Sequence, residues 1–101
     1  SVFEQDFLKV DFASRTVFIK NEKIHLTPIE YRLLAVMIKY AGKVVTHRQL
    51  LEEVWGGEKG EDFNQYARVY MAHLRRKIEP DPAHPKILIT EVGIGYRLIT
   101  D

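Results

Sequence analysis

The sequence predicts an α+β fold in which antiparallel strands come first, three helices follow and a strand hairpin ends the chain. Apolar and polar residues alternate with a period of two before residue 27 and after residue 86, which is typical of half-buried strands. Two helix-capping signals and a third segment of helical periodicity lie between these regions. A chain of 101 residues can bury one modest core, so we expect a single domain covering 1–101.

The N-terminal part is predicted to be a meander of three short strands. Residues 7–12, 16–20 and 23–26 show the alternation of apolar and polar side chains. The segments that separate them, residues 13–15 and 21–22, contain small and polar residues that favour tight turns. Strands joined by such short turns pair with their neighbours, so we expect an antiparallel sheet.

A strong helix start follows at Thr27. Thr27 is a preferred N-cap residue, Pro28 suits the first helical position, and Glu30 is placed to complete a capping box. The helix is predicted to run to about Ala41 and to end at Gly42. Its buried stripe is predicted to consist of Leu33, Leu34, Met37 and Ile38.

A second capping signal at residues 46–49 begins a shorter helix, which is predicted to end at Gly56 and Gly57. Four residues with helical spacing are predicted to face the core: Leu50, Leu51, Val54 and Trp55. The loop 56–63 carries mostly acidic charge and leads to the third helix.

The third predicted helix, residues 64–78, holds four basic residues and no acidic one, although the whole chain has a formal net charge of only +1. At about 100° per residue, one face is apolar and is predicted to be buried, with Ala67, Met71, Leu74 and Ile78. The opposite face carries Gln65, Val69, Ala72 and Arg76. Arg68 and Arg75 lie along one flank of that face, and Tyr66 and His73 lie along the other.

This concentration of positive charge predicts binding to a polyanion. Solvated helices usually mix charges of both signs, because opposite charges three or four residues apart stabilise each other. Small residues at the centre of the outer face would let the helix approach DNA closely while the arginines reach phosphates. The alternative is an ordinary solvated helix end, where Arg75, Arg76 and Lys77 complement the negative end of the helix dipole.

The third helix cannot continue past three prolines, Pro80, Pro82 and Pro85. Alternation resumes in residues 87–91 and 96–100, on either side of a turn at 92–95, which predicts a hairpin. Three helices followed by a hairpin form a winged helix-turn-helix, in which the third helix enters the major groove of DNA and the hairpin, or wing, lies beside it. The predicted fold class is therefore an α+β winged helix-turn-helix with an N-terminal strand meander.

Four segments of the chain carry a resemblance to a known family: LTPIEYRLLAVM, VVTHRQLLEEVWG, VYMAHLRRKIEP and ITEVGIGYRLI. Together they are similar to the winged-helix effector domains of OmpR/PhoB-type two-component response regulators. The segments QLLEEVWG, RVYMAHLRRKIE and TEVGIGYR are most similar to the members that regulate high-affinity potassium uptake.

The resemblance implies a sequence-specific DNA-binding regulator of transcription, here of potassium transport genes. It implies a receiver domain, absent from this chain, that a sensor kinase phosphorylates. It also implies a homodimer on direct-repeat promoter sites and contact with RNA polymerase through loop 56–63. No apolar run approaches membrane-spanning length and no signal peptide opens the chain, so we expect a cytoplasmic protein without a membrane contact.

The resemblance also implies, position by position, which residues contact DNA. The DNA-facing set on the third helix is Gln65, Tyr66, Arg68, Val69, Ala72, His73 and Arg75. Contacts to the DNA backbone are implied for Trp55, Thr90 and Tyr96. The residues themselves add Arg48 at the start of the second helix, Arg76, and Gly93 in the wing. Many relatives carry an arginine where this chain has Ala72 or His73, so the resemblance does not fix the base-reading pattern of this chain.

The chemistry of these side chains suggests their roles. Arg68 is nearer the helix N-terminus and is expected to contact a base edge, whereas Arg75 and Arg76 are expected to bind phosphates. Val69 and Ala72 suit thymine methyl groups. Two roles are possible for each of three residues. His73 either donates a hydrogen bond to DNA or has no part in binding. Trp55 is first a core residue, and its indole edge could also reach the DNA backbone; Tyr96 either packs beneath the wing or donates its hydroxyl to a phosphate.

Two other functions compete with DNA binding. An enzyme is disfavoured because the sequence contains no HExxH motif, nucleophile elbow or P-loop, and we expect neither a metal nor a cofactor. A winged helix that binds a protein without reading DNA is the more serious alternative, since one fold serves many functions. That alternative predicts an apolar patch or mixed charges on the third helix.

Overall fold

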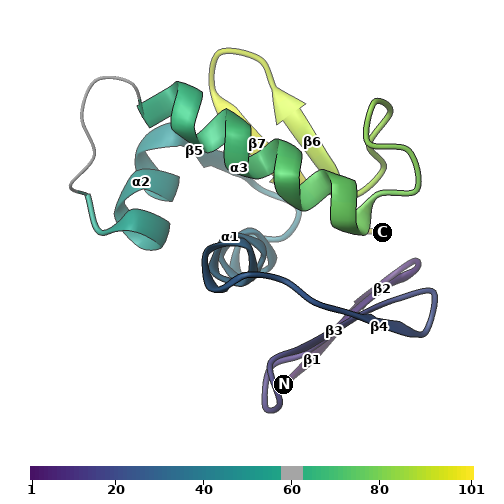
Figure 1. Cartoon of the computed structure of the whole chain (residues 1–101). Coiled ribbons are helices and arrows are strands. Elements are labelled where there is room, and N and C mark those ends of the chain that lie inside the picture. The colour runs from purple at the N-terminus through teal and green to yellow at the C-terminus, as the bar shows by residue number, and fades with distance from the viewer. Residues whose placement is uncertain (58–62) are drawn as a thin grey trace.

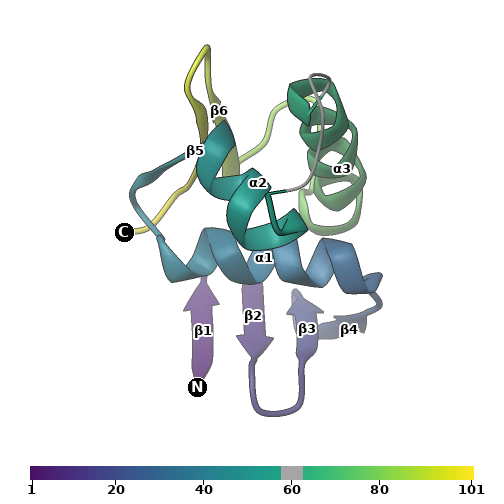
Figure 2. The ribbon, with the colours of Figure 1, turned by 90° about the vertical axis from the view of Figure 1, so that its left-hand side faces the viewer.

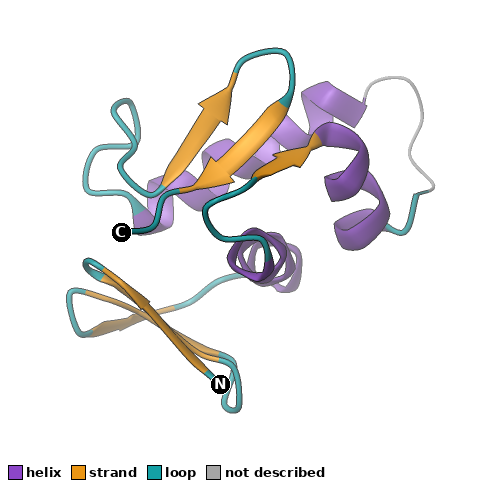
Figure 3. Cartoon of the chain, turned by 180° about the vertical axis from the view of Figure 1, so that it is seen from behind, coloured by secondary structure: helices purple, strands orange, loops and turns teal. Residues whose placement is uncertain are grey.

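A computed structural model describes residues 1–57 and 63–101, and it confirms the predicted α+β winged helix-turn-helix (Figure 1, Figure 3). The elements follow the chain in this order: β1 (Val2–Gln5), β2 (Leu8–Asp11), β3 (Thr16–Ile19), β4 (Glu22–Ile24), α1 (Pro28–Lys39), β5 (Val44–Thr46), α2 (His47–Trp55), α3 (Phe63–Ile78), β6 (Leu88–Glu91) and β7 (Gly95–Leu98). Within the described residues, none of the helices is both long and apolar enough to span a bilayer.

The N-terminal meander has four antiparallel strands in the order β1-β2-β3-β4, so the prediction of three was wrong. The missed strand is β1, whose buried position is occupied by the polar residue Gln5 and therefore gives no apolar alternation. Strand β1 is defined by its antiparallel pairing with β2, in which Phe3 lies opposite Val10. The turn before β4 falls at Lys20 and Asn21, both with positive φ, one residue earlier than predicted.

Both predicted capping boxes are present. Thr27 Oγ1 accepts a hydrogen bond from the Glu30 amide at 3.3 Å, and Glu30 Oε1 accepts one from the Thr27 amide at 2.9 Å. Thr46 and Gln49 exchange the same pair of bonds at the start of α2. Each box satisfies amides that have no partner inside the helix, which explains why both helices begin where the sequence predicts.

Helix α1 lies between the N-terminal sheet on one side and helices α2 and α3 on the other (Figure 2). Of its predicted stripe, Leu33, Leu34 and Met37 are fully buried, while Ile38 is partly buried. In α2, Leu50 and Val54 are buried, whereas two further predicted core residues, Leu51 and Trp55, are partly exposed. These residues join α1 and α2 in one core.

The C-terminal sheet has three strands in the order β5-β7-β6, so the predicted two-stranded hairpin is extended by β5. Val45 in β5 lies opposite Tyr96 in β7. The last of the three residues of β5, Thr46, is also the N-cap of α2, and the partner strand lies about fifty positions later, so no local pattern revealed the strand. Gly95 allows the close approach of the two strands, because a Cβ at this position would lie 1.9 Å from the Val45 carbonyl oxygen.

Helices α1 and α3 are joined by an ion pair in which Glu30 is buried and Lys77 is partly exposed. Lys77 Nζ at the end of α3 lies 2.6 Å from Glu30 Oε1 at the start of α1. Burial of Glu30 would raise the pKa of its carboxyl group, but the hydrogen bonds and charge supplied by Lys77 and Thr27 outweigh burial and hold the pKa below its ordinary value of 4.5. This pair fixes the end of α3 against the first turn of α1.

We expect Gly95→Ala to lower the free energy of unfolding by about 2 to 3 kcal/mol, because the added methyl group meets the Val45 backbone. Urea unfolding at neutral pH measures this change. Gly93→Ala is the matched control: it also adds a methyl group to the wing, but no heavy atom lies within 4 Å, and its positive φ costs about 1 kcal/mol. Equal losses in the two variants would contradict the proposed close approach.

We expect Glu30→Gln to lower the free energy of unfolding at pH 7 by about 1 kcal/mol, because Gln can still cap α1 but cannot pair with Lys77. Since folding lowers the pKa of Glu30, its contribution is present well above pH 4.5 and is lost as the pH falls through the folded value. Unfolding measured from pH 7 to pH 3 should therefore depend less on pH in the variant. The more exposed pair of Glu53 and Lys39 gives the control Glu53→Gln, which should change stability less at pH 7.

Candidate nucleic-acid interface

Helix α3 is anchored by the apolar face that the sequence predicts. Its core-facing residues are at most 1% exposed: Ala67, Met71, Leu74 and Ile78. The opposite face is exposed along the helix, at Gln65, Val69, Ala72 and Arg76. Figure 1 shows α3 at the outside of the helical layer with the wing beside it. The side chains of this outer face are therefore available to a partner along the length of the helix.

The four basic residues of α3 have three different environments. Lys77 pairs with Glu30 on α1 and so belongs to the core side of the helix. Arg75 is half-buried and bonded to the wing. Arg68 and Arg76 are exposed, and within the described residues neither has an ion-pair partner. The positive charge available on the outer face therefore comes from Arg68 and Arg76.

Arg75 connects α3 to β6. Its Nε donates to the Leu88 carbonyl oxygen at 3.0 Å, and its Nη2 donates to Thr90 Oγ1 at 2.9 Å. The guanidinium carbon lies 5.5 Å from the centre of the Tyr96 ring. Burial lowers the pKa of Arg75 from its ordinary value, and Tyr96 and Glu79 act in the opposite direction. The predicted phosphate contact of Arg75 is untested, but two of its nitrogens already have partners inside the protein.

Tyr96 lies beneath the wing rather than on its surface. It is 4% exposed, and its ring meets the His47 ring edge to face at a centroid distance of 5.8 Å. The His47 amide also donates to the Ile94 carbonyl oxygen at 3.2 Å. Of the two predicted roles of Tyr96, packing beneath the wing is therefore observed, and phosphate binding stays a prediction. The Tyr96–His47 contact links the wing to the start of α2.

Trp55 belongs to an aromatic cluster that joins the end of α2 to the first half of α3. Its ring centre lies 5.2 Å from Phe63, 5.4 Å from Tyr66 and 5.7 Å from Tyr70. The Tyr70 ring in turn lies 5.8 Å from His73. Trp55 Nε1 is buried, and no described residue accepts a hydrogen bond from it. The backbone contact predicted for Trp55 therefore stays a prediction, and in this conformation the indole N–H does not face solvent.

Arg48 is exposed in the first turn of α2. It lines a concavity of about 330 Å³ between the starts of α2 and α3, together with His47, Leu51, Glu52, Gly57, Phe63 and Asn64. The first turn of a helix attracts anions because its amides point outward. This position therefore adds an exposed arginine to a concavity that reaches the start of α3.

The wing carries exposed apolar residues at its tip. Val92 is 89% exposed and Ile94 is 54% exposed, on either side of Gly93, which has a φ of +76°. Arg97 of the wing donates from Nε to Glu91 Oε2 at 2.8 Å. Val92 and Ile94 are not among the contacts predicted from the sequence, although two apolar residues within a predicted turn indicate an exposed apolar site.

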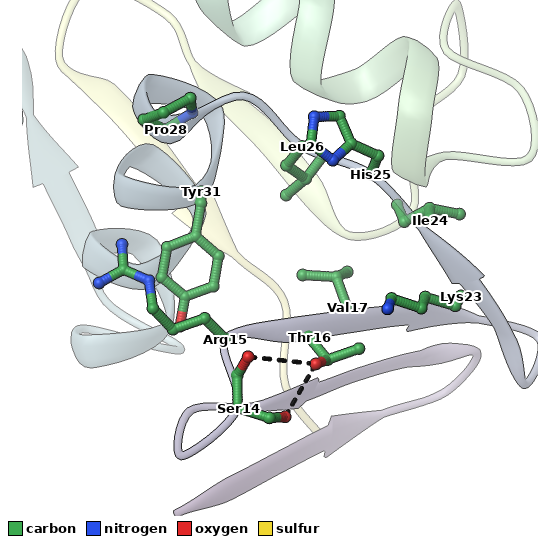
Figure 4. A pocket seen from close by; sticks show the side chains of 10 residues that line it. All are labelled: Ser14, Arg15, Thr16, Val17, Lys23, Ile24, His25, Leu26, Pro28 and Tyr31. Atoms are coloured by element: carbon green, nitrogen blue, oxygen red, sulfur yellow. Dashed lines mark hydrogen bonds between the residues drawn. The ribbon is translucent and has the colours of Figure 1, made fainter.

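A second concavity lies between the N-terminal sheet and α1 (Figure 4). Its volume is about 370 Å³, and Arg15, Lys23 and His25 are among the residues that line it. Arg15 lies over the Tyr31 ring at 4.5 Å. Since α1 separates the N-terminal sheet from α3, this concavity is distinct from the outer face of α3 (Figure 2). Within residues 1–57 and 63–101, no group of three His, Cys, Asp or Glu side chains is placed to hold a metal ion.

Comparison with known proteins gives a consistent result. The family model described as "Transcriptional regulatory protein, C terminal" matches residues 21–98. The KDP operon transcriptional regulatory protein KdpE of Escherichia coli K12 is 56% identical over 90 residues, which are 89% of this chain and 40% of KdpE. KdpE of Mycobacterium tuberculosis H37Rv is 46% identical over 96 residues, which are 95% of this chain and 42% of that protein. The chain thus spans about two fifths of the length of these curated relatives.

Solved structures share the fold. Response regulator DrrB of Thermotoga maritima, an OmpR/PhoB homolog, has a TM-score of 0.88 and 34% identity, covering 97% of this chain and 44% of DrrB. The DNA-binding domain of Klebsiella pneumoniae RstA, in complex with the RstA box, also has a TM-score of 0.88, covering 98% of this chain and 97% of that domain. Because its identity is 20%, the RstA likeness shows the fold alone.

Proposed function

Because the chain belongs to the OmpR/PhoB family of winged-helix domains, the C-terminal domains of transcriptional regulatory proteins, we propose that it binds double-stranded DNA sequence-specifically and thereby controls transcription. The family consists of transcription regulators, and the chain is not an enzyme. In the proposed complex α3 lies in the major groove, and the wing lies on the adjacent backbone and minor groove.

The observation that carries this proposal is the acid-free outer face of α3. Arg68 and Arg76 are exposed there, with the short side chains of Val69 and Ala72 between them. Arg68 on one flank of this face and Arg76 in its last turn can reach phosphates, while the short side chains between them let the helix backbone come close to the bases. A surface for a protein partner would more often carry mixed charges or a larger apolar patch.

The proposed roles follow the positions along α3. Gln65 and Arg68 lie in its N-terminal half and read base edges, while Val69 and Ala72 meet thymine methyl groups. Arg76 in the last turns binds phosphate, and Arg48 binds phosphate from the start of α2. The remaining proposed contacts are at the borders of this surface: Tyr66 and His73 on the side of α2, and Thr90 and Gly93 in the wing.

We further propose that residues 1–101 are the effector domain of a longer response regulator of potassium transport genes. The support is the identity of 56% and 46% with two KdpE proteins, of which the chain matches about two fifths. The same relationship suggests a receiver domain and sensor kinase, a homodimer on direct repeats, and a location in the cytoplasm with the DNA. The proposed RNA polymerase contact is loop 56–63, of which residues 58–62 lie outside the described residues.

The proposal predicts that binding to duplex DNA weakens steeply with salt, with a slope of about −0.9 in a log-log plot for each phosphate neutralised. Fluorescence anisotropy with a labelled duplex, selected from randomised sequences, measures this slope between low and physiological salt. Arg76→Ala should make the slope shallower by about 0.9, because one phosphate contact is lost. A chain that binds no duplex at low salt, while remaining folded by circular dichroism, would favour the protein-binding alternative.

We also expect Arg68→Ala to reduce discrimination between the selected duplex and a scrambled one by about tenfold or more, as the loss of a bidentate base contact does. Arg76→Ala should weaken binding to both duplexes alike, because phosphates are the same in every sequence. Competition titrations with the two duplexes separate these outcomes. If both variants lose affinity equally for the two duplexes, the assignment of Arg68 to base reading is wrong.

A further inference from the structure

We propose that Arg75 is a positioning residue that holds the wing at a fixed angle to α3. The inference rests on the proposed DNA binding, and it concerns which side chains determine whether the wing reaches the DNA. It adds a role inside the protein to the DNA contacts that the resemblance implies for Arg75 and Thr90, since the two side chains are bonded to each other.

The first support is the geometry of the guanidinium group. Arg75 donates from two different nitrogens to two residues of β6, the Leu88 carbonyl oxygen at 3.0 Å and Thr90 Oγ1 at 2.9 Å. A planar group held at two points on one strand restricts both the distance and the rotation of that strand relative to α3. Arg76, the next residue, is exposed and makes no such bond to any described residue. Neighbouring arginines therefore have different surroundings.

The second support is the place of β6 in the sheet. In the order β5-β7-β6, strand β6 is at the edge and is paired with β7 alone. Its outer side has carbonyl groups that no strand covers, and Arg75 bonds to one of them. At the start of β6, the Glu79 carboxylate accepts hydrogen bonds from the amides of Lys86, Ile87 and Leu88. Further along β6, the strand is bonded to α3 through Arg75. Among the described side chains of α3, Arg75 is the one that donates hydrogen bonds to β6.

The third support is the charge of the wing. Residues 87–98 of the wing contain one acidic residue, Glu91, and one basic residue, Arg97, so the wing has no net charge. The two side chains form an ion pair at 2.8 Å. Its most exposed side chains are the apolar Val92 and Ile94. Apolar contacts act over short distances, whereas charges attract phosphates over several ångströms. A neutral wing therefore contributes to binding when it is held in the right place, which is what the Arg75 bonds provide.

Substitutions that keep charge but break the bonds test this proposal. Arg75→Lys retains one positive charge but cannot make two bonds from a planar group, and Thr90→Val retains the shape of Thr90 but removes the hydroxyl acceptor. Thr90→Ser keeps the hydroxyl and is the conservative rescue. Arg76→Ala is the matched control for loss of a phosphate contact. Affinity, salt dependence and hydroxyl-radical footprints are measured with the selected duplex.

We expect Arg75→Lys and Thr90→Val each to weaken binding by about tenfold, which corresponds to about 1.4 kcal/mol, with the salt slope unchanged. The footprint of the wing in the minor groove should be lost, while methylation protection by α3 in the major groove persists. The double variant should be no weaker than Arg75→Lys alone, since both changes break the same link. Thr90→Ser should restore most of the affinity and the wing footprint. Arg76→Ala should instead make the salt slope shallower and leave the wing footprint in place.

The proposal is overturned if Arg75→Lys binds within about twofold of the wild type, or if Arg75→Lys and Thr90→Val both leave the angle between α3 and the wing unchanged. Should Arg75→Lys fail to fold, Thr90→Val carries the test, because it changes an exposed residue. Residual dipolar couplings of the DNA-free protein measure the angle between α3 and the wing directly. If the protein binds no DNA, the proposed function fails, but the angle between α3 and the wing can still be measured. A changed angle in Arg75→Lys or Thr90→Val would then support this inference independently of DNA binding.

Discussion

Burial of one apolar stripe of α3 is the constraint on which the rest of the structure depends. Ala67, Met71, Leu74 and Ile78 are excluded from water by the packing of α3 on α1 and α2. This burial fixes the rotation of α3 about its own axis, because the stripe occupies one side of the helix. Once the rotation is fixed, the opposite side must face outward, and Arg68 and Arg76 are exposed as a consequence.

The same constraint divides the basic residues of α3 by their angular position. Lys77 lies next to the buried stripe and reaches Glu30 of α1. Arg75 lies on the flank that faces the wing and is bonded to β6. A count of positive charges in the sequence treats these residues as equivalent, but in the fold Lys77 joins two helices, Arg75 joins a helix to a strand, and Arg68 and Arg76 are exposed.

Local signals in the sequence were sufficient for most of the fold and for part of the candidate site. The capping boxes begun by Thr27 and Thr46, and the exposed face of α3, were predicted correctly because each depends on residues within one or two helical turns. Strands β1 and β5 were missed because their pairing partners define them. The direction of the Arg75 side chain was also beyond the sequence, since its acceptors at Leu88 and Thr90 become neighbours only after the wing folds back onto α3.

Two kinds of interaction are therefore separated in space on the proposed DNA-binding surface. The exposed arginines of α2 and α3 supply attraction that extends over about a Debye length, roughly 8 Å at physiological salt, and that weakens as salt is added. The wing offers Val92 and Ile94, whose contacts need close approach and do not depend on ion release. Charge can bring the helix to any DNA sequence, but a neutral hairpin contributes only where the groove has the width that its fixed position requires. On the proposed surface, a rigid link between α3 and β6 would therefore restrict which DNA shapes the domain accepts.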